Sequence, residues 1–242
     1  LPAYSFRTAP KESLKRKITF AVMADSRAAP GGPTHAQDGV NVEALGDLVR
    51  SVYNAHPEMV FFTGDFSDGY TTLRPDFENQ ERTFFRTIEA AAREIPFYTM
   101  RGNHETLVHW YSDGVFYDRE AEDSSERVFS EMVVNPRNAP IPERQGLPPY
   151  LESTYSFDYG ALHFTTLTTE YWYTKNPELV PGVLRGTIMD RQMQWLDDDL
   201  AAARKRGCKM LFVFAHEPAF PNGGHVGDAM YYGGKKPEML AM

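Results

Sequence analysis

Short apolar runs alternate with stretches of helical spacing through the first hundred residues. Residues 18–24, 59–63 and 97–100 have the length and composition of buried strands. Between them, apolar residues recur at helical intervals, namely Val42, Leu45, Val49 and Val52, and then Phe84, Phe85, Ile88, Ala91 and Ala92. This alternation predicts a largely parallel sheet that is covered on both faces.

The rest of the chain departs from this rhythm and then returns to it. Residues 106–150 are rich in aromatics and prolines, with a short helix predicted near 128–133, and we expect this insertion to form one wall of a cleft. Residues 155–167 predict a hairpin that turns at 158–160. Thr187 and Asp190 are predicted to cap a helix that ends near Gly207, and a last strand follows at 210–215.

Composition limits the classes of protein that fit. The chain has 242 residues, 42% of them hydrophobic, and no internal repeat, so we expect one domain over residues 1–242. No run approaches the roughly 18 uninterrupted apolar residues of a membrane-spanning helix. The formal net charge of −8 argues against binding to long nucleic acid. The single cysteine, Cys208, excludes an internal disulfide.

Both ends of the chain suggest a fragment. Leu1 is not an initiator methionine, and Met242 lies inside an apolar stretch without a polar tail. We therefore expect the C-terminal part of the domain to be missing. A removed leader peptide would explain the start, which slightly favours an exported protein over a cytoplasmic one.

Polar residues typical of metal sites follow four of the predicted strands. Asp25 follows the first, residues 64–68 (Gly-Asp-Phe-Ser-Asp) the second, residues 101–105 (Arg-Gly-Asn-His-Glu) the third, and His216 the last. Ligands of open α/β sheets collect beyond the carboxyl ends of the strands. Carboxylate, amide and imidazole groups in that position predict a metal centre.

In their order and placement, these motifs resemble those of the calcineurin-like metallophosphoesterases, from residue 18 to residue 216. Residues 156–160, 194–196 and 213–216 add to the resemblance. It implies a four-layer αββα sandwich of two mixed sheets flanked by helices, here expected to lack its C-terminal strands. It also implies hydrolysis of a small phosphomonoester or phosphodiester, in which two metal ions about 3.5–4 Å apart activate a bridging hydroxide.

The resemblance also implies a role for each ligand. Asp65 would bridge both metals, Asp25 would bind the first, and Asn103 and His216 would bind the second. The donors suit manganese, iron or zinc without choosing among them. His104 would not bind metal but would act as the general acid on the leaving group. Glu105 is expected either to orient that imidazole or to lie on the surface at the start of a loop.

One departure from the family pattern lies in the first motif. Arg27 stands where the family usually has a histidine ligand, and a guanidinium cannot bind a metal. It would contact a substrate phosphate or, alternatively, form a salt bridge to a neighbouring aspartate. Asp68 occupies the offset at which purple acid phosphatases place a metal-binding tyrosine, so we hypothesise that it binds the first metal, favouring manganese, iron or magnesium. The alternative is that Asp68 caps a turn beside Gly69.

A second departure is that the final Gly-His-x-His motif of the family does not occur. Residues 224–227 resemble it superficially, and we interpret them as a mobile loop with His225 as a candidate substrate contact. His109 is a second such candidate. The remaining histidines, His35, His56 and His163, are expected to be solvated or packed side chains.

These departures leave two functions open. The first is the metal-dependent phosphoester hydrolase described above. The second is a domain that keeps the fold, has weakened catalysis and binds a phosphorylated ligand or a protein. Arg27 supports the second function, whereas the retention of all five residues of the centre (Asp25, Asp65, Asn103, His104 and His216) favours the enzyme.

Overall fold

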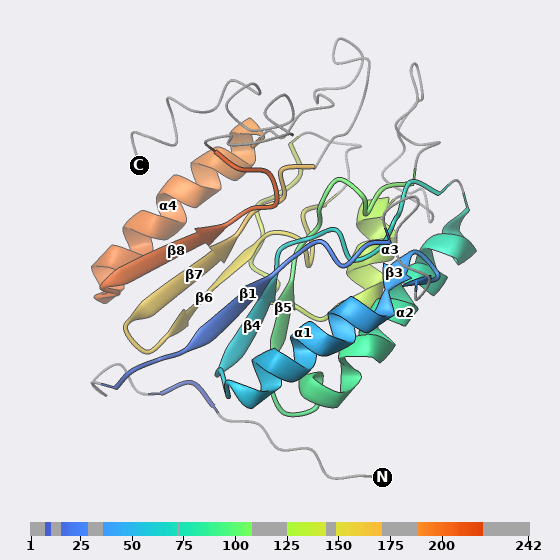
Figure 1. The fold of residues 1–242 in the computed structure, drawn as a ribbon. Coiled ribbons are helices and arrows are strands. Elements are labelled where there is room, and N and C mark those ends of the chain that lie inside the picture. Colours follow the sequence, from blue (N-terminus) through green and yellow to red (C-terminus); the bar gives the residue numbers. More distant parts are fainter. Residues whose placement is uncertain are drawn as a thin grey trace.

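The computed structural model describes residues 8–10, 16–28, 36–71, 73–107, 125–143, 149–170 and 188–219. They form layers in the order helices, sheet, sheet, helix, which confirms the predicted sandwich (Figure 1). The helices are α1 (Val42–Asn54), α2 (Arg74–Ala92), α3 (Ser125–Met132) and α4 (Asp190–Arg206). The strands are β1 (Phe20–Met23), β2 (Ala36–Gln37), β3 (Val40–Asn41), β4 (Met59–Phe62), β5 (Phe97–Thr99), β6 (Tyr155–Tyr159), β7 (Leu162–Thr166) and β8 (Met210–Phe214). None of the helices in these ranges is both long and apolar enough to cross a bilayer.

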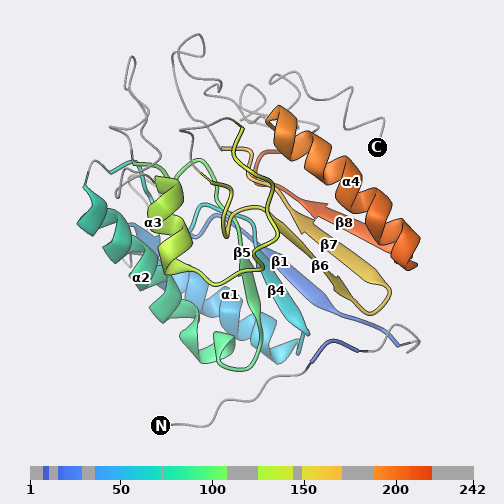
Figure 2. The ribbon, with the colours of Figure 1, turned by 180° about the vertical axis from the view of Figure 1, so that it is seen from behind.

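Over the described residues the first sheet pairs only in parallel, in the order β1-β4-β5, whereas both sheets were predicted to be mixed. α1 connects β1 to β4 and α2 connects β4 to β5, so both crossovers are helical, as parallel pairing requires. Together with α3, these helices cover one face of the sheet (Figure 2). All three strands therefore end at the same edge, where the polar motifs follow.

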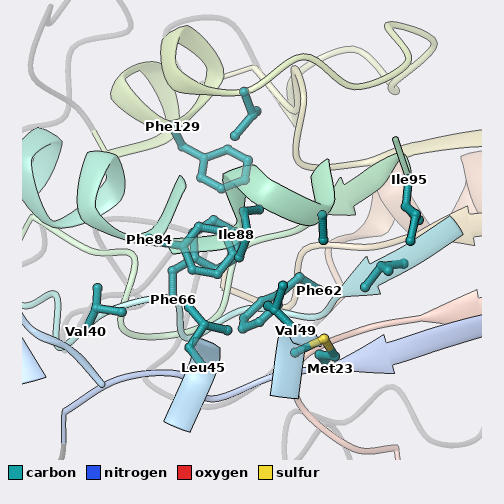
Figure 3. Close-up of a cluster of buried hydrophobic side chains, with 13 residues drawn as sticks. Met23, Val40, Leu45, Val49, Phe62, Phe66, Phe84, Ile88, Ile95 and Phe129 are labelled. Atoms are coloured by element: carbon teal, nitrogen blue, oxygen red, sulfur yellow. The ribbon is translucent and has the colours of Figure 1, made fainter. Parts of the chain in front are cut away.

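β4 shows why a continuous apolar run suits this position. Val60 and Phe62 pack toward the helices, in the cluster of Figure 3. Met59 and Phe61 pack in the opposite direction, toward the second sheet, where the ring of Phe61 stacks on that of Phe214 with centroids 4.4 Å apart. Because both faces are covered, alternate residues are buried on opposite sides and the strand has no polar face.

The second sheet has the order β6-β7-β8, with an antiparallel hairpin followed by a parallel pair. Its outer face is covered by α4 (Figure 1). The hairpin turns at residues 160–161, slightly later than predicted. The predicted cap at Asp190 is wrong, because Asp190 is the first residue of α4 and the N-cap is Met189, whose side chain makes no capping hydrogen bond. Instead, Glu143 accepts hydrogen bonds from two backbone amides in the first turn.

Within this sheet, His163 is a wholly buried imidazole between two carboxylates. Its Nδ1 lies 2.6 Å from Asp158 Oδ1 and its Nε2 lies 2.8 Å from Asp199 Oδ2. Burial alone would lower the pKa of His163, but the hydrogen bonds to Asp199 and Asp158 raise it above its ordinary value. Hydrogen bonds from Arg206 and then from His163 lower the pKa of Asp158 to about 2. His163 is therefore packed rather than solvated.

We expect this cluster to stabilise the fold most between about pH 4 and about pH 6.5, the ordinary pKa values of aspartate and histidine. The raised pKa of His163 contributes stability that is complete below its unfolded value and lost as pH rises through the folded value. The lowered pKa of Asp158 contributes stability that is lost as pH falls toward about 2. Urea unfolding with a chelator present should show that the stability lost in His163→Gln is larger at about pH 6 than at about pH 9. A loss that is the same at both pH values would contradict this assignment.

Candidate metal centre

Residues from three strand ends meet at the carboxyl edge of the first sheet. Asp65 follows β4 and Asn103 follows β5, while His216 arrives from β8 of the second sheet. His216 Nε2 lies 3.3 Å from Asp65 Oδ1 and 3.1 Å from Asn103 Oδ1. The structure therefore brings together three predicted ligands that are up to 151 residues apart in the chain, since residue 216 minus residue 65 is 151.

Two glycines permit this close approach. A Cβ on Gly64 would lie 2.4 Å from the backbone nitrogen of Gly102, and a Cβ on Gly102 would lie 2.3 Å from Asp65 Oδ1. The loops after β4 and β5 therefore touch backbone to backbone, which no residue with a side chain allows. The glycines of the two motifs are needed for the geometry of the ligands beside them.

The backbone is strained at two of the predicted ligands. Asp25 and Asp65 both have positive φ angles, of 58° and 57°. The left-handed region is sparsely populated by residues other than glycine and costs of the order of 1–3 kcal/mol for each. The two loops are held in register by hydrogen bonds from the backbone nitrogen of Asp25 to Gly64 O and from that of Ser26 to Asp65 O. Such strain at two equivalent strand ends is typical of functional sites.

The structure places Glu105 neither beside the His104 ring nor on the surface, the two positions predicted for it. It is completely buried, and its carboxylate accepts hydrogen bonds from the backbone nitrogens of Asp65, Phe66 and Gly102 at 2.7–2.8 Å. Burial, with Asp65 nearby, raises the pKa of Glu105 to about 7. The expectations that it orients His104 or lies on the surface are both wrong. Glu105 instead ties the loop of Asp65 to the loop of Asn103.

His216 shows that the donors fit a metal. Its Nδ1 lies 2.9 Å from Thr63 O, and because a backbone carbonyl only accepts, this nitrogen carries the hydrogen. In the neutral ring, Nε2 then directs its lone pair at Asp65 Oδ1 and Asn103 Oδ1. Three atoms with lone pairs repel one another at this distance unless a proton or a metal cation lies between them. Burial lowers the pKa of His216, but Asp65 and other acids nearby raise it overall. A metal-binding histidine usually donates one ring N–H to a carbonyl or carboxylate, while its other ring nitrogen binds the metal. His216 has this arrangement.

His104 lies beside these ligands without joining them. Its Nδ1 is 2.6 Å from the backbone oxygen of Asp68, so this nitrogen also carries a hydrogen, and its Nε2 lies 3.9 Å from Asp65 Oδ2. The ring packs against Tyr70, with centroids 4.5 Å apart, and the hydroxyl of Tyr70 accepts a hydrogen bond from Asn103 Nδ2. Nε2 is therefore aimed at the centre. Sequence reasoning missed Tyr70, whose only sequence signal is its place just after the motif at 64–68.

Arg27 contacts Asp65, and Asp68 contacts His104 through its backbone oxygen. Arg27 Nε is 3.4 Å from Asp65 Oδ2, so the ion pair that was one of its predicted alternatives forms in this structure. One carboxylate oxygen of Asp68, Oδ1, is buried and accepts no hydrogen bond from the described residues. Burial raises the pKa of Asp68, while His104 and Arg27 act in the opposite direction. A buried carboxylate oxygen without a hydrogen bond fits a cation ligand better than a turn cap.

Glu170 is a second buried carboxyl group that sequence reasoning missed, and it lies close enough to His216 to raise the pKa of that ring. Burial, and then the charge of Glu217, raises the pKa of Glu170 to about 8. Its only sequence signal is its position just beyond the predicted strand that ends at residue 167. The structure does not describe His109, His225 or much of the 106–150 insertion, so the substrate contacts and the cleft wall expected there stay predictions.

Comparison with protein families gives a match to one family. The sequence model described as "Calcineurin-like phosphoesterase" matches residues 18–236. Among curated proteins, human (Homo sapiens) serine/threonine-protein phosphatase CPPED1 is 32% identical over 78 residues, 32% of this chain and 23% of that protein. A protein of Arabidopsis thaliana named "Probable inactive purple acid phosphatase 9" is 25% identical over 199 residues, 78% of this chain and 26% of that protein. This chain thus spans about a quarter of the length of these relatives.

Solved structures show the same fold. Purple acid phosphatase PPD1 from yellow lupin (Lupinus luteus) seeds aligns with a TM-score of 0.56 and 19% identity, over 89% of this chain and 33% of that one. A dimetal phosphatase from Danio rerio aligns with a TM-score of 0.57 and 15% identity, over 93% of this chain and 76% of that one. At these identities the likeness concerns the fold alone.

Proposed function

Because this chain belongs to the calcineurin-like phosphoesterase family, whose sequence model matches residues 18–236, we propose that it hydrolyses a small phosphorylated substrate at the centre around Asp65. Asp25, Asp65, Asp68, Asn103 and His216 would hold two metal ions. When bound, such ions polarise a phosphoester and lower the pKa of a metal-bound water to near neutral. Manganese, iron and zinc all suit these donors, and the oxygen-rich side with Asp25 and Asp68 favours a hard cation.

The observation that carries this proposal is the arrangement around His216. Its Nε2 faces one carboxylate and one amide oxygen within 3.3 Å, while Nδ1 is engaged by Thr63 O. Because Nδ1 already carries a hydrogen, Nε2 can bind a cation that these two oxygens also hold. The arrangement is pre-organised for a cation because the backbone, rather than the ligands themselves, fixes the ring.

His104 would supply the proton for the leaving group. The backbone oxygen of Asp68 holds Nδ1, so the ring cannot turn that nitrogen toward the substrate. Nε2 is left as the nitrogen that carries or releases the second proton, on the side of Asp65. A general acid needs this fixed orientation, because proton transfer requires hydrogen-bond reach to the leaving oxygen.

Arg27 would bind a phosphate oxygen of the substrate. In this structure it neutralises Asp65, and its side chain remains 28% exposed. Cations held by Asp65 would neutralise its charge in place of Arg27, and the guanidinium could then form a bidentate contact with phosphate. The candidate contact His109 remains a prediction from sequence.

Replacing Asp68 with asparagine is expected to remove one metal ion per chain without disturbing His104. The imidazole is held by the backbone oxygen of Asp68, which the substitution leaves in place. An amide binds a hard cation less well than a carboxylate, because it carries no charge. Metal analysis after dialysis should find about half of the wild-type content, since one of the two proposed ions is lost. Full occupancy in Asp68→Asn would end its role as a ligand.

The activity itself is tested with two chromogenic substrates, p-nitrophenyl phosphate and bis(p-nitrophenyl) phosphate, in the presence of manganese. We expect the protein to hydrolyse at least one of them, a chelator to abolish the activity and added manganese to restore it. Asp65→Asn serves as the inactive control. A metal-loaded protein that cleaves neither ester would contradict the proposal.

One observation favours the second candidate, a domain that binds a phosphorylated ligand without efficient catalysis. Arg27 forms an ion pair with the carboxylate that is proposed to bridge the metals, and this cation competes with metal binding. One relative also carries the word "inactive" in its name. Under this alternative, the metal sites stay empty in the presence of manganese and both esters remain intact. Metal analysis and the ester assay therefore separate the two functions.

A further inference from the structure

A second cluster of metal-binding side chains lies at the other end of the second sheet. It contains Asp158 near the end of β6, His163 in β7 and Cys208 just before β8, and one ligand atom of each lies within 4.8 Å of the others. In this sheet residue 162 pairs with residue 210, at the start of β8, whereas His216 follows the end of that strand. The cluster is therefore separate from the candidate phosphoesterase centre.

The second ring nitrogen of His163 is already oriented as in a metal site. Its Nε2 lies 2.8 Å from Asp199 Oδ2. Asp199 is fixed in turn, because Ser156 Oγ donates to one of its oxygens at 2.8 Å and Thr165 Oγ1 to the other at 3.0 Å. A metal-binding histidine usually donates its outer N–H to a carboxylate, which sets the ring orientation and raises the basicity of the inner nitrogen. Here Nδ1 is that inner nitrogen, and it lies 2.6 Å from Asp158 Oδ1.

We propose that Asp158, His163 and Cys208 bind one divalent ion of the zinc class. The donors would be an imidazole nitrogen, a thiolate sulfur and one carboxylate oxygen, a set that suits zinc or cobalt rather than magnesium or calcium. Asp158 is 28% exposed, so solvent reaches the site and can complete a tetrahedral arrangement. The ion would join the β6–β7 hairpin to the turn between α4 and β8.

The charged groups of the cluster allow a metal ion to replace protons there. Without a metal, Arg206 pairs with Asp158, and the two ring nitrogens of His163 lie within hydrogen-bond distance of Asp158 and Asp199. On binding, the metal replaces the proton on His163 Nδ1 and the proton of the Cys208 thiol, and both protons go to solvent. Arg206 donates to both oxygens of Asp158 and is 44% exposed, so it can keep Oδ2 while Oδ1 turns to the ion. Binding should therefore strengthen as pH rises.

Cobalt titration tests this site without interference from the other centre. Cys208 is the only cysteine in the chain, so a thiolate-to-cobalt charge-transfer absorption can arise only from the proposed site. We expect this absorption to saturate at one equivalent of cobalt per chain, to disappear on addition of zinc, and to be lost in Cys208→Ser. Asp65→Asn, which alters the other centre, should retain it.

Asp199→Asn tests the positioning role. We expect it to weaken cobalt binding about 10- to 100-fold while the charge-transfer absorption is retained at saturation, because Asp199 orients His163 without touching the ion. His163→Gln should lose the ordered site. The proposal is overturned if excess cobalt gives no thiolate absorption in the wild type, or if His163→Gln gives the same absorption with the same affinity, since the thiol would then bind cobalt alone.

Discussion

Replacing His104 with asparagine is expected to lower kcat/KM for phosphoester hydrolysis by about 10²- to 10⁴-fold, the usual contribution of a general acid. The side-chain amide of asparagine can still donate to the backbone oxygen of Asp68, so the loop should keep its conformation. The metal ligands are unchanged, and metal content should equal that of the wild type. What is lost is the proton-donating nitrogen that faces Asp65.

The dependence on the leaving group makes this prediction specific. A nitrophenolate leaves readily without a proton, whereas an alkoxide does not, so the defect of His104→Asn should be smaller for nitrophenyl phosphate than for an alkyl phosphate. Steady-state kinetics on the two substrates measures the difference. Equal losses on both, with full metal content, would show that His104 acts in some way other than protonating the leaving group.

Replacing Glu105 with alanine is expected to lower the free energy of unfolding by about 3 kcal/mol or more. Three buried backbone N–H groups, of Asp65, Phe66 and Gly102, would lose their acceptor, and each such group costs about 1–3 kcal/mol. Glu105→Gln should be intermediate, because its carbonyl oxygen can serve the two amides that share Oε2, while its NH2 group faces the N–H of Phe66. Urea unfolding with a chelator present measures these effects without any contribution from bound metal.

An exposed glutamate provides the matched control for Glu105. Glu89 lies on α2, is 55% exposed and forms an ion pair across one helical turn with Arg93. Glu89→Ala should therefore change the free energy of unfolding by no more than about 0.5 kcal/mol. If Glu105→Ala is as stable as Glu89→Ala, the carboxylate does not hold the two ligand loops together.

Much of the fold was predictable because its signals are local. The four strands that lead to the centre were recognised from apolar runs. Each ends one residue earlier than predicted, and three of them begin at the predicted residue, while β1 begins two residues later. The apolar stripe predicted for α2 covered only its second half, from Phe84 to Ala92, whereas the helix begins at Arg74. Pro75 in its first turn was an available signal, since proline is well tolerated there. The first half of α2 was missed because it has few apolar residues, with Phe77 the only buried one before Phe84.

Other contacts were not predictable because they join residues that are distant in the chain. Glu105 receives two of its hydrogen bonds from residues 39 and 40 positions earlier, and a lone glutamate after a histidine gives no sign of that. His163 meets Asp199 from 36 positions away. The first turn of α4 is capped by Glu143, from nearly 50 positions earlier. Carboxylates of this kind look like surface residues until the fold supplies their partners.

The sequence by itself determined which chemical groups stand at the ends of the strands, because strand period and the order of motifs are properties of the chain alone. Only the tertiary structure decided how those groups face one another. The packing of the two sheets places His216 beside Asp65 and Asn103. The close contact of Gly64 with Gly102 lets the two loops approach each other. The physical reason is that distance and hydrogen-bond direction between remote residues arise from packing, which short motifs do not encode.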